Sequence, residues 1–169
     1  MKCILIRHGI AVERDEWEGT DENRPLTDRG KKRVRQAAAG LASLGCKPTH
    51  LYTSPFVRAY DTARLLRTMV CPGLKVETRE ELAVGANPEQ LVNILQTLPS
   101  DAVVLCVGHE PFLGEVVSLF LCGKVLPNFL FKKAGPLASK WRVRVGRGSV
   151  GCAGGYHRYS YGFWASGHG

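Results

Sequence analysis

The stretch Lys2-Cys3-Ile4-Leu5-Ile6-Arg7-His8-Gly9 decides the fold of this chain, because an apolar run of strand character ends abruptly in Arg-His-Gly. Such a run predicts a buried first strand. In open α/β sheets the ligand crevice lies outside the carboxyl ends of the strands, so Arg7 and His8 should stand in that crevice. Gly9 would let the backbone turn away and let a ligand approach closely. Taken alone, the stretch is equally typical of a strand followed by an ordinary polar loop.

A second apolar strand also ends in a histidine beside a glycine. Residues 101–107 form the clearest buried strand of the sequence, and Gly108-His109-Glu110 follows it. Pro111 then opens a helix that extends to about residue 121. Two strand ends therefore place a histidine at the same kind of position.

The remaining segments alternate between strands and helices. Further strands are predicted at residues 49–53, 75–78, 128–132 and 137–145, and further helices at residues 28–44, from residue 55 onward and at residues 88–98. This alternation predicts an α/β fold, a three-layer sandwich around a mostly parallel central sheet. Because residues 1–145 contain no repeat and no linker, we expect a single domain over that range.

Two helix starts carry recognisable signals. Thr27 is the predicted N-cap of the first helix, which Gly45 ends, and Ser54 is the predicted N-cap of the second, with Pro55 at its first position. Arg58 then falls in the first turn, where backbone N–H groups and the helix dipole favour anions. We interpret Arg58 as a group that helps this helix end to hold an anion, although surface arginines are common.

The composition limits the class of protein. The chain has 169 residues, enough for one domain with a sizeable core, and no apolar run reaches the length of a membrane span. Arg7 and His8 interrupt the first apolar run too early for a signal peptide. The six cysteines are scattered without a C-x-x-C pair, so we expect a cytoplasmic protein with no disulfide framework and no zinc site. Cys3 and Cys106 are expected in the core.

Charge is distributed unevenly along the chain. Of the net charge of +8, residues 1–130 carry +1, from 16 Lys and Arg against 15 Asp and Glu, and residues 131–169 carry the other +7. A nearly neutral body argues against nucleic-acid binding. Residues 146–169 hold eight glycines and no acid, so we expect a flexible basic tail or a non-native end caused by a shifted reading frame. The acidic residues 10–25 should form a solvated loop or the rim of the crevice.

Several charged side chains follow the carboxyl ends of predicted strands, which parallel pairing brings to one edge of the sheet. They are Arg7, His8, Arg58, Glu80, Glu81 and His109. This combination suits phosphoryl transfer. Arg7 and Arg58 can hold phosphate oxygens, and a neutral His8 can attack phosphorus. A protonated His109 can stabilise the transferring oxygens, and Glu81 can protonate the leaving group.

A metal centre is the competing interpretation of these histidines. Such a centre would favour more carboxylates and no flanking arginine, because Arg7 opposes a cation beside His8. The other histidines do not complete a ligand set, since His50 precedes a strand and His157 and His168 lie in the tail. We therefore expect no metal and no cofactor.

Four motifs, in order along the chain, resemble those of the histidine phosphatase superfamily, which includes the phosphoglycerate mutases and acid phosphatases. They are Arg7-His8-Gly9, Arg24-Pro25-Leu26-Thr27, Ser54-Pro55-Phe56-Val57-Arg58-Ala59 with Thr62-Ala63, and Gly108-His109. Together they cover about the first 125 residues. The compact length and residues 23–30 look most like the SixA-type phosphohistidine phosphatases. The resemblance implies a phosphoglycerate mutase-like fold.

The resemblance also implies roles for the site residues. His8 would be the nucleophile, which is transiently phosphorylated. The phosphate-binding residues would be Arg7, Gly9, Arg58 and His109. The family acid is placed at Glu81, because Glu81-Leu82 best matches the acid-leucine pattern, and Glu80 is the alternative.

Chain length bears on the choice of substrate. Only 22 residues separate Arg58 from Glu81, and 27 separate Glu81 from His109, so the helical insertions that roof the site in larger members of the family have no room here. We expect an open, shallow pocket that receives a phosphohistidine side chain on a signalling protein. A phosphatase or mutase of small phosphoesters, or a non-catalytic phosphate-binding module, is the alternative. We expect no membrane partner and no specific nucleic acid.

Overall fold

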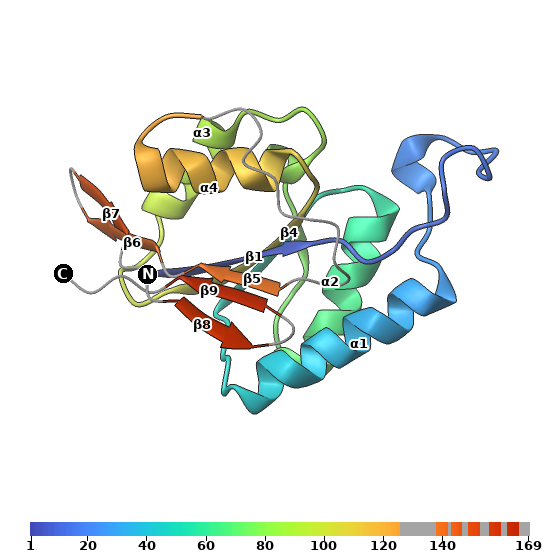
Figure 1. Cartoon of the computed structure of the whole chain (residues 1–169), viewed down its shortest axis with the longest axis horizontal. Coiled ribbons are helices and arrows are strands. Elements are labelled where there is room, and N and C mark those ends of the chain that lie inside the picture. The colour runs from blue at the N-terminus through green and yellow to red at the C-terminus, as the bar shows by residue number, and fades with distance from the viewer. Residues whose placement is uncertain (126–137, 142, 147–148, 153–155, 160–161, 166–169) are drawn as a thin grey trace.

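A central sheet with helices on both faces organises the molecule (Figure 1). The computed structural model describes residues 1–125 with their side chains and, further along, the backbone of residues 138–141, 143–146, 149–152, 156–159 and 162–165. The three-layer α/β sandwich predicted from the alternation of elements is confirmed. Within the described residues, no helix is both long enough and apolar enough to cross a membrane.

One side of the main sheet is all parallel, whereas the other side combines parallel and antiparallel pairs. In the described part of the chain its order is β3-β2-β4-β1-β5-β9-β8. The parallel strands are β1 (Lys2–Arg7), β2 (His50–Thr53), β3 (Glu77–Thr78) and β4 (Val103–Gly108). The later strands are β5 (Ala138–Trp141), antiparallel to β1, then β9 (Gly162–Ala165) and β8 (Tyr156–Tyr159). A separate antiparallel pair is formed by β6 (Val143–Gly146) and β7 (Ser149–Cys152).

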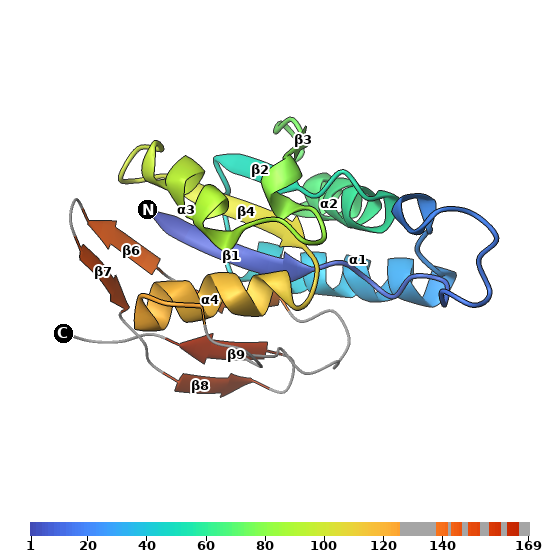
Figure 2. The same ribbon diagram turned by 90° about the horizontal axis from the view of Figure 1, so that it is seen from above.

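Two pairs of helices cover the parallel strands. One pair is α1 (Asp28–Ser43) and α2 (Val57–Val70), and the other is α3 (Pro88–Gln96) and α4 (Phe112–Cys122). Figure 2 shows α1 and α2 side by side, away from α3 and α4. Two short 3₁₀ helices, η1 (Asp21–Asn23) and η2 (Glu80–Leu82), lie in the connecting loops.

Strand β1 separates two hydrophobic cores. Cys3 and Leu5 belong to the cluster that contains the α3 and α4 side chains, whereas Ile4 and Ile6 belong to the cluster beneath α1 and α2. All four residues are at most 2% exposed, because successive side chains of a strand point to opposite faces and both faces are covered here. Cys106 is equally buried, so the predicted core positions of Cys3 and Cys106 are confirmed.

The helix signals are confirmed for α1 and wrong for α2. Thr27 caps α1, since its Oγ1 accepts a hydrogen bond of 3.0 Å from the Gly30 N–H. Ser54 does not cap α2 and Pro55 is not its first residue. The helix begins at Val57, and its N-cap, Phe56, makes no side-chain hydrogen bond to the helix end. Ser54 instead contacts His109, a residue far along the chain.

The C-terminal elements differ from those expected. The predicted strand at residues 75–78 is reduced to Glu77–Thr78, and the one at 137–145 is divided into β5 and β6. The predicted strand at 128–132 lies outside the described residues. Within residues 146–169, expected as a flexible tail, the structure contains β7, β8 and β9. Tyrosine, phenylalanine and tryptophan favour strands there despite the glycines. The domain boundary at residue 145 stays a prediction.

Candidate active site

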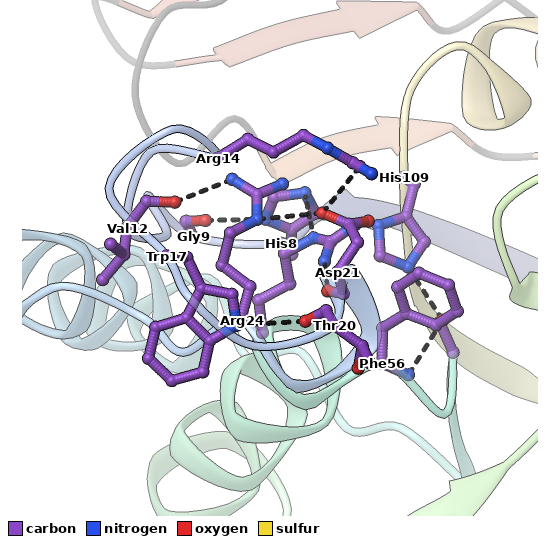
Figure 3. Close-up of polar contacts among 12 residues, drawn as sticks. His8, Gly9, Val12, Arg14, Trp17, Thr20, Asp21, Arg24, Phe56 and His109 are labelled. Atoms are coloured by element: carbon purple, nitrogen blue, oxygen red, sulfur yellow. Dashed lines mark hydrogen bonds and ion pairs between the residues drawn. The ribbon is translucent and has the colours of Figure 1, made fainter.

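The two histidines at the strand ends meet across neighbouring strands. β1 and β4 pair so that Arg7 lies opposite Gly108, and the His8 N–H donates a hydrogen bond of 3.0 Å to the Gly108 carbonyl. This register places the next residue of each strand side by side. The His8 and His109 ring centroids are 5.0 Å apart, and Figure 3 shows the two rings in one group with Asp21. The structure thus brings His8 and His109 together as the sequence predicts.

The hydrogen bonds of His8 leave one ring nitrogen with a lone pair. Nδ1 lies 2.7 Å from the Gly9 carbonyl oxygen, which can only accept, so Nδ1 carries the proton. Nε2 accepts a hydrogen bond of 3.3 Å from Arg58 Nε. Burial lowers the pKa of His8 to about 4, helped by the charges of Arg58 and Arg7 and opposed by the bond to Gly9. At neutral pH the imidazole is therefore neutral, as a nitrogen nucleophile must be.

Arg58 lies in the first turn of α2 and its side chain is almost fully buried. Besides the bond from Nε to His8, its terminal nitrogens donate to the backbone oxygen of Asp21 at 2.6 Å and to the Asp21 carboxylate at 2.9 Å. The Phe56 ring lies against the guanidinium, 5.0 Å from Cζ to the ring centroid. A forked cation in contact with the nucleophile is suited to holding phosphate oxygens.

Gly9 is required by packing against α1. A Cβ on Gly9 would lie 2.7 Å from the Val34 side chain, and one on Gly30 would lie 2.1 Å from the Ile10 carbonyl oxygen. Gly9 has no positive φ, and its N–H donates to Thr62 Oγ1 at 3.0 Å. The structure thus gives Gly9 a packing role against a helix, and its expected role beside a ligand stays a prediction.

Thr62 joins the end of β1 to α2. Its Oγ1 accepts from Gly9 and donates to the Arg58 carbonyl oxygen at 2.7 Å, and the side chain is buried. This hydroxyl therefore couples the backbone beside His8 to the helix turn that carries Arg58. Sequence reasoning gave Thr62 no role beyond its place in a motif.

His109 is held by Ser54 and Phe56. Its Nε2 lies 2.8 Å from Ser54 Oγ, and the Phe56 ring packs edge-on at 5.1 Å between centroids. Its Nδ1 is buried without a hydrogen-bond partner among the described residues, so a phosphate oxygen would satisfy it. Burial, then the neighbouring His8 and Arg58, lower the pKa of His109 to about 3. The protonated form expected from the sequence is thus not the resting form, because burial and the charges of Arg58 and Arg7 oppose it.

The remaining predicted residues are less tightly bound to this centre. Arg7 is half-buried, and its charge lowers the pKa values of both His8 and His109. Glu80 and Glu81 belong to η2, and no hydrogen bond or ion pair in the described residues joins either carboxylate to His8, Arg58 or His109. The assignment of Glu81 as the acid, with Glu80 as the alternative, stays a prediction.

Glu110 is a titratable group that sequence reasoning passed over. It directly follows His109, and both carboxylate oxygens are buried without a hydrogen bond of normal geometry to the described residues. Burial raises the pKa of Glu110 to about 7, whereas the charge of Arg7 and the nearby Gly114 N–H oppose the shift. A carboxyl group at the end of β4 is therefore partly protonated near neutral pH.

The arrangement is suited to handling phosphate with a histidine as nucleophile. In the described part of the chain, no group of three His, Cys, Asp or Glu side chains is placed to hold a metal ion. Positive charge comes from arginines, and the neutral His8 presents a lone pair beside Arg58. These are the groups required to accept a phosphoryl group on nitrogen.

Comparison with known proteins agrees with this chemistry. The family model of the histidine phosphatase superfamily (branch 1) matches residues 3–84. A solved structure of the protein histidine phosphatase SixA complexed with tungstate has a TM-score of 0.69 and 27% identity, covering 77% of this chain and 83% of that one. The chain belongs to the histidine phosphatase superfamily, as its four motifs predicted, and is an enzyme of that superfamily.

Two relatives extend the likeness over most of the chain. The phosphohistidine phosphatase SixA of Escherichia coli strain K12 is 28% identical over 131 residues, which are 76% of this chain and 80% of that protein. An uncharacterized protein of Picosynechococcus sp. is 32% identical over 137 residues, 80% of this chain and 82% of the relative. Both matches span much more than the first motif.

Proposed function

We propose that this enzyme is a phosphohistidine phosphatase that acts on a phosphorylated histidine of another protein. The observation that carries the proposal is the neutral, doubly hydrogen-bonded His8 beside Arg58, in a chain similar to SixA over 80% of that protein's length. The short intervals between Arg58, Glu81 and His109 support it, because they hold only the rest of α2, then β3, η2, α3 and β4 with their loops. A site to which the residues between Arg58 and His109 add no roof suits a side chain presented by a second protein.

The reaction follows from the two ring nitrogens of His8. The Arg58 Nε–H turns from Nε2 to a phosphate oxygen, and the freed Nε2 lone pair attacks phosphorus. The bond between phosphorus and the substrate's ring nitrogen breaks, and that nitrogen keeps the electron pair. Water then attacks the phosphorus of phospho-His8, releasing inorganic phosphate and regenerating the neutral ring. The sum is phosphohistidine and water giving histidine and phosphate. Arg58 and Arg7 compensate the charge on the oxygens throughout.

The leaving group explains why an acid that is not hydrogen-bonded to the site histidines suffices. A phosphoimidazole that is protonated on its second nitrogen leaves as a neutral ring, whereas an alkoxide must gain a proton in the transition state. The lack of any hydrogen bond in the described residues from Glu80 or Glu81 to the catalytic histidines is compatible with the first kind of leaving group and unfavourable for the second.

A substrate panel without added metal tests the proposal. We expect kcat/KM on a phosphohistidine protein to exceed that on p-nitrophenyl phosphate and on phosphoglycerates, and we expect a chelator to leave it unchanged. Rapid quenching should trap an acid-labile phosphoenzyme. Preference for a small phosphoester would favour the alternative substrate class. Loss of activity on chelation, restored by one metal, would overturn the mechanism.

A further inference from the structure

The carboxylate of Asp21 is shared by three arginines. Arg58 lies 2.9 Å from Oδ2, while Arg24 and Arg14 lie 3.0 Å and 3.3 Å from Oδ1 (Figure 3). Burial alone would raise the pKa of Asp21, but the hydrogen bonds and charges of Arg58 and Arg24 together outweigh it and lower the pKa. The carboxylate is therefore ionised, and it belongs to η1 in the loop of residues 10–25.

Asp21 holds Arg58 through two separate groups. Its backbone oxygen accepts from one terminal nitrogen of Arg58 at 2.6 Å, and its carboxylate accepts from the other at 2.9 Å. The Nε of Arg58 is directed to His8. A guanidinium has five N–H donors, so these three bonds leave about two for phosphate oxygens. Rotation of the fork would break all three bonds, and Asp21 accepts two of them.

The loop around Asp21 is itself tied down. Arg24 Nε binds the Asp21 carboxylate, and another Arg24 nitrogen donates to the Val12 carbonyl oxygen at 2.7 Å, so Arg24 bridges the two sides of the loop. The Trp17 indole N–H donates to the Thr20 carbonyl oxygen directly before η1. The acceptor that orients Arg58 is therefore held in place by bonds on its far side.

We infer that Asp21 is a positioning residue: it fixes the Arg58 fork against His8 so that the phosphate clamp is formed before substrate arrives. The inference rests on the proposed phosphate chemistry of His8 and Arg58, but it does not depend on which leaving group the substrate carries. Pre-orientation of this kind affects rate strongly, because a misplacement of about 1 Å can cost about 100-fold. The electrostatic effect of removing Asp21 has the opposite sign, since the loss of an anion beside the clamp would strengthen the binding of phosphate, which is also an anion.

The test compares Asp21→Ala, Asp21→Asn and the matched control Glu22→Gln, which removes an exposed carboxylate from the same turn. Two readouts are measured on the full chain: vanadate affinity by calorimetry, and kcat and KM on a phosphohistidine protein. We expect Asp21→Ala to weaken vanadate binding about tenfold and to lower kcat about 100-fold. Asp21→Asn keeps a neutral acceptor and should recover part of both. Glu22→Gln should resemble the wild type.

Several results would overturn the inference. Tighter vanadate binding in Asp21→Ala would show that Asp21 only competes with the phosphate. An unchanged kcat, with nothing but a lower melting temperature, would reduce Asp21 to a structural residue. Equal losses in the asparagine and alanine variants would exclude hydrogen-bonded positioning. Wild-type protein that bound vanadate but turned over no phosphohistidine would contradict the proposed substrate and leave the positioning role to be judged on binding alone, with a tenfold loss in Asp21→Ala still required.

Discussion

The ends of β1 and β4 look alike in sequence and differ in what surrounds them. Both strands are buried, and each is followed by a histidine with a glycine beside it. His8 has both ring nitrogens hydrogen-bonded, one to a backbone carbonyl and one to an arginine. His109 has one nitrogen bound to Ser54 and the other without a partner among the described residues. Two similar motifs thus acquire different chemistry from their neighbours.

The difference predicts which histidine reacts and which assists. A carbonyl acceptor on Nδ1 fixes the tautomer of His8, so the lone pair of Nε2 is defined in advance. Among the described residues no such acceptor fixes His109, and its unpaired Nδ1 is suited to a ligand oxygen. The residues that follow also differ, because Gly9 makes room for α1, whereas Glu110 adds a buried carboxyl group. The following predictions separate the two strand ends experimentally.

The largest effect should come from removing the nucleophile. His8→Ala should lower turnover about 10,000-fold or more, because no other group described here can take the phosphoryl group. His109→Ala should still form the phosphoenzyme, and its turnover should fall about 100- to 1,000-fold. A loss of this size is typical when one group that stabilises transition-state charge is removed. Quenched reactions with labelled substrate would show a phosphoenzyme only in the second variant. A phosphoenzyme in His8→Ala would reverse the assignment.

Acid should destabilise the fold through the two strand ends. The ordinary histidine pKa is near 6.5, whereas that of His8 is about 4 and that of His109 about 3, so the unfolded chain binds protons first. The free energy of unfolding should therefore be highest above pH 6.5 and should fall by on the order of 3 kcal/mol as the pH drops toward 4. Urea unfolding at several pH values measures this. His109→Asn should make the free energy of unfolding depend less on pH than His50→Gln does, since His50 is a control outside the site. An equal change in both variants would contradict the assignment of the acid effect to His109.

The elements and the strand-end residues could be predicted because their signals are local. Periodicity located β1, β4 and the helices, and the carboxyl-end rule then placed Arg7, His8 and His109. Contacts between distant segments carry no such signal. Ser54 resembles a helix cap, yet its hydroxyl binds a histidine 55 residues away, and the helix begins three residues later.

Asp21 shows the same limit for a charged residue. It is one of six acids in the loop of residues 10–25, and nothing in composition distinguishes it from its exposed neighbours. The available signal was its position three residues before Arg24, which begins one of the family motifs. Glu110 could likewise have been noticed as a carboxylate between a site histidine and a proline, but only burial shows that its pKa is raised.

A smaller effect is expected for the group that holds His109. Ser54→Ala should leave His109 Nε2 buried without its partner and lower the free energy of unfolding by about 1–3 kcal/mol. Turnover should fall less than in His109→Ala, since the ring remains. Thr53→Ser, at the neighbouring buried hydroxyl, is the control for packing. Thermal unfolding and kcat should be measured on both variants. If Ser54→Ala changed neither the melting temperature nor kcat, the role of Ser54 would be contradicted.

The smallest effect concerns Glu110. Its pKa is raised from 4.5 to about 7, so between these values the folded chain keeps a proton that the unfolded chain has released. The contribution of Glu110 to the free energy of unfolding should therefore fall as the pH rises through that window, and it should stop falling above pH 7. Glu110→Gln removes the titration. It should stabilise the protein at pH 8 relative to the wild type by on the order of 1–2 kcal/mol, reduced because the side chain is partly solvated. At pH 4.5 the two proteins should differ little.

Glu89→Gln, an exposed carboxylate at the start of α3, is the matched control and should not gain stability between the two pH values. Urea unfolding at pH 4.5 and pH 8 measures both variants, and a stabilisation of Glu110→Gln that is equal at the two pH values would show that burial of the charge is not its cause.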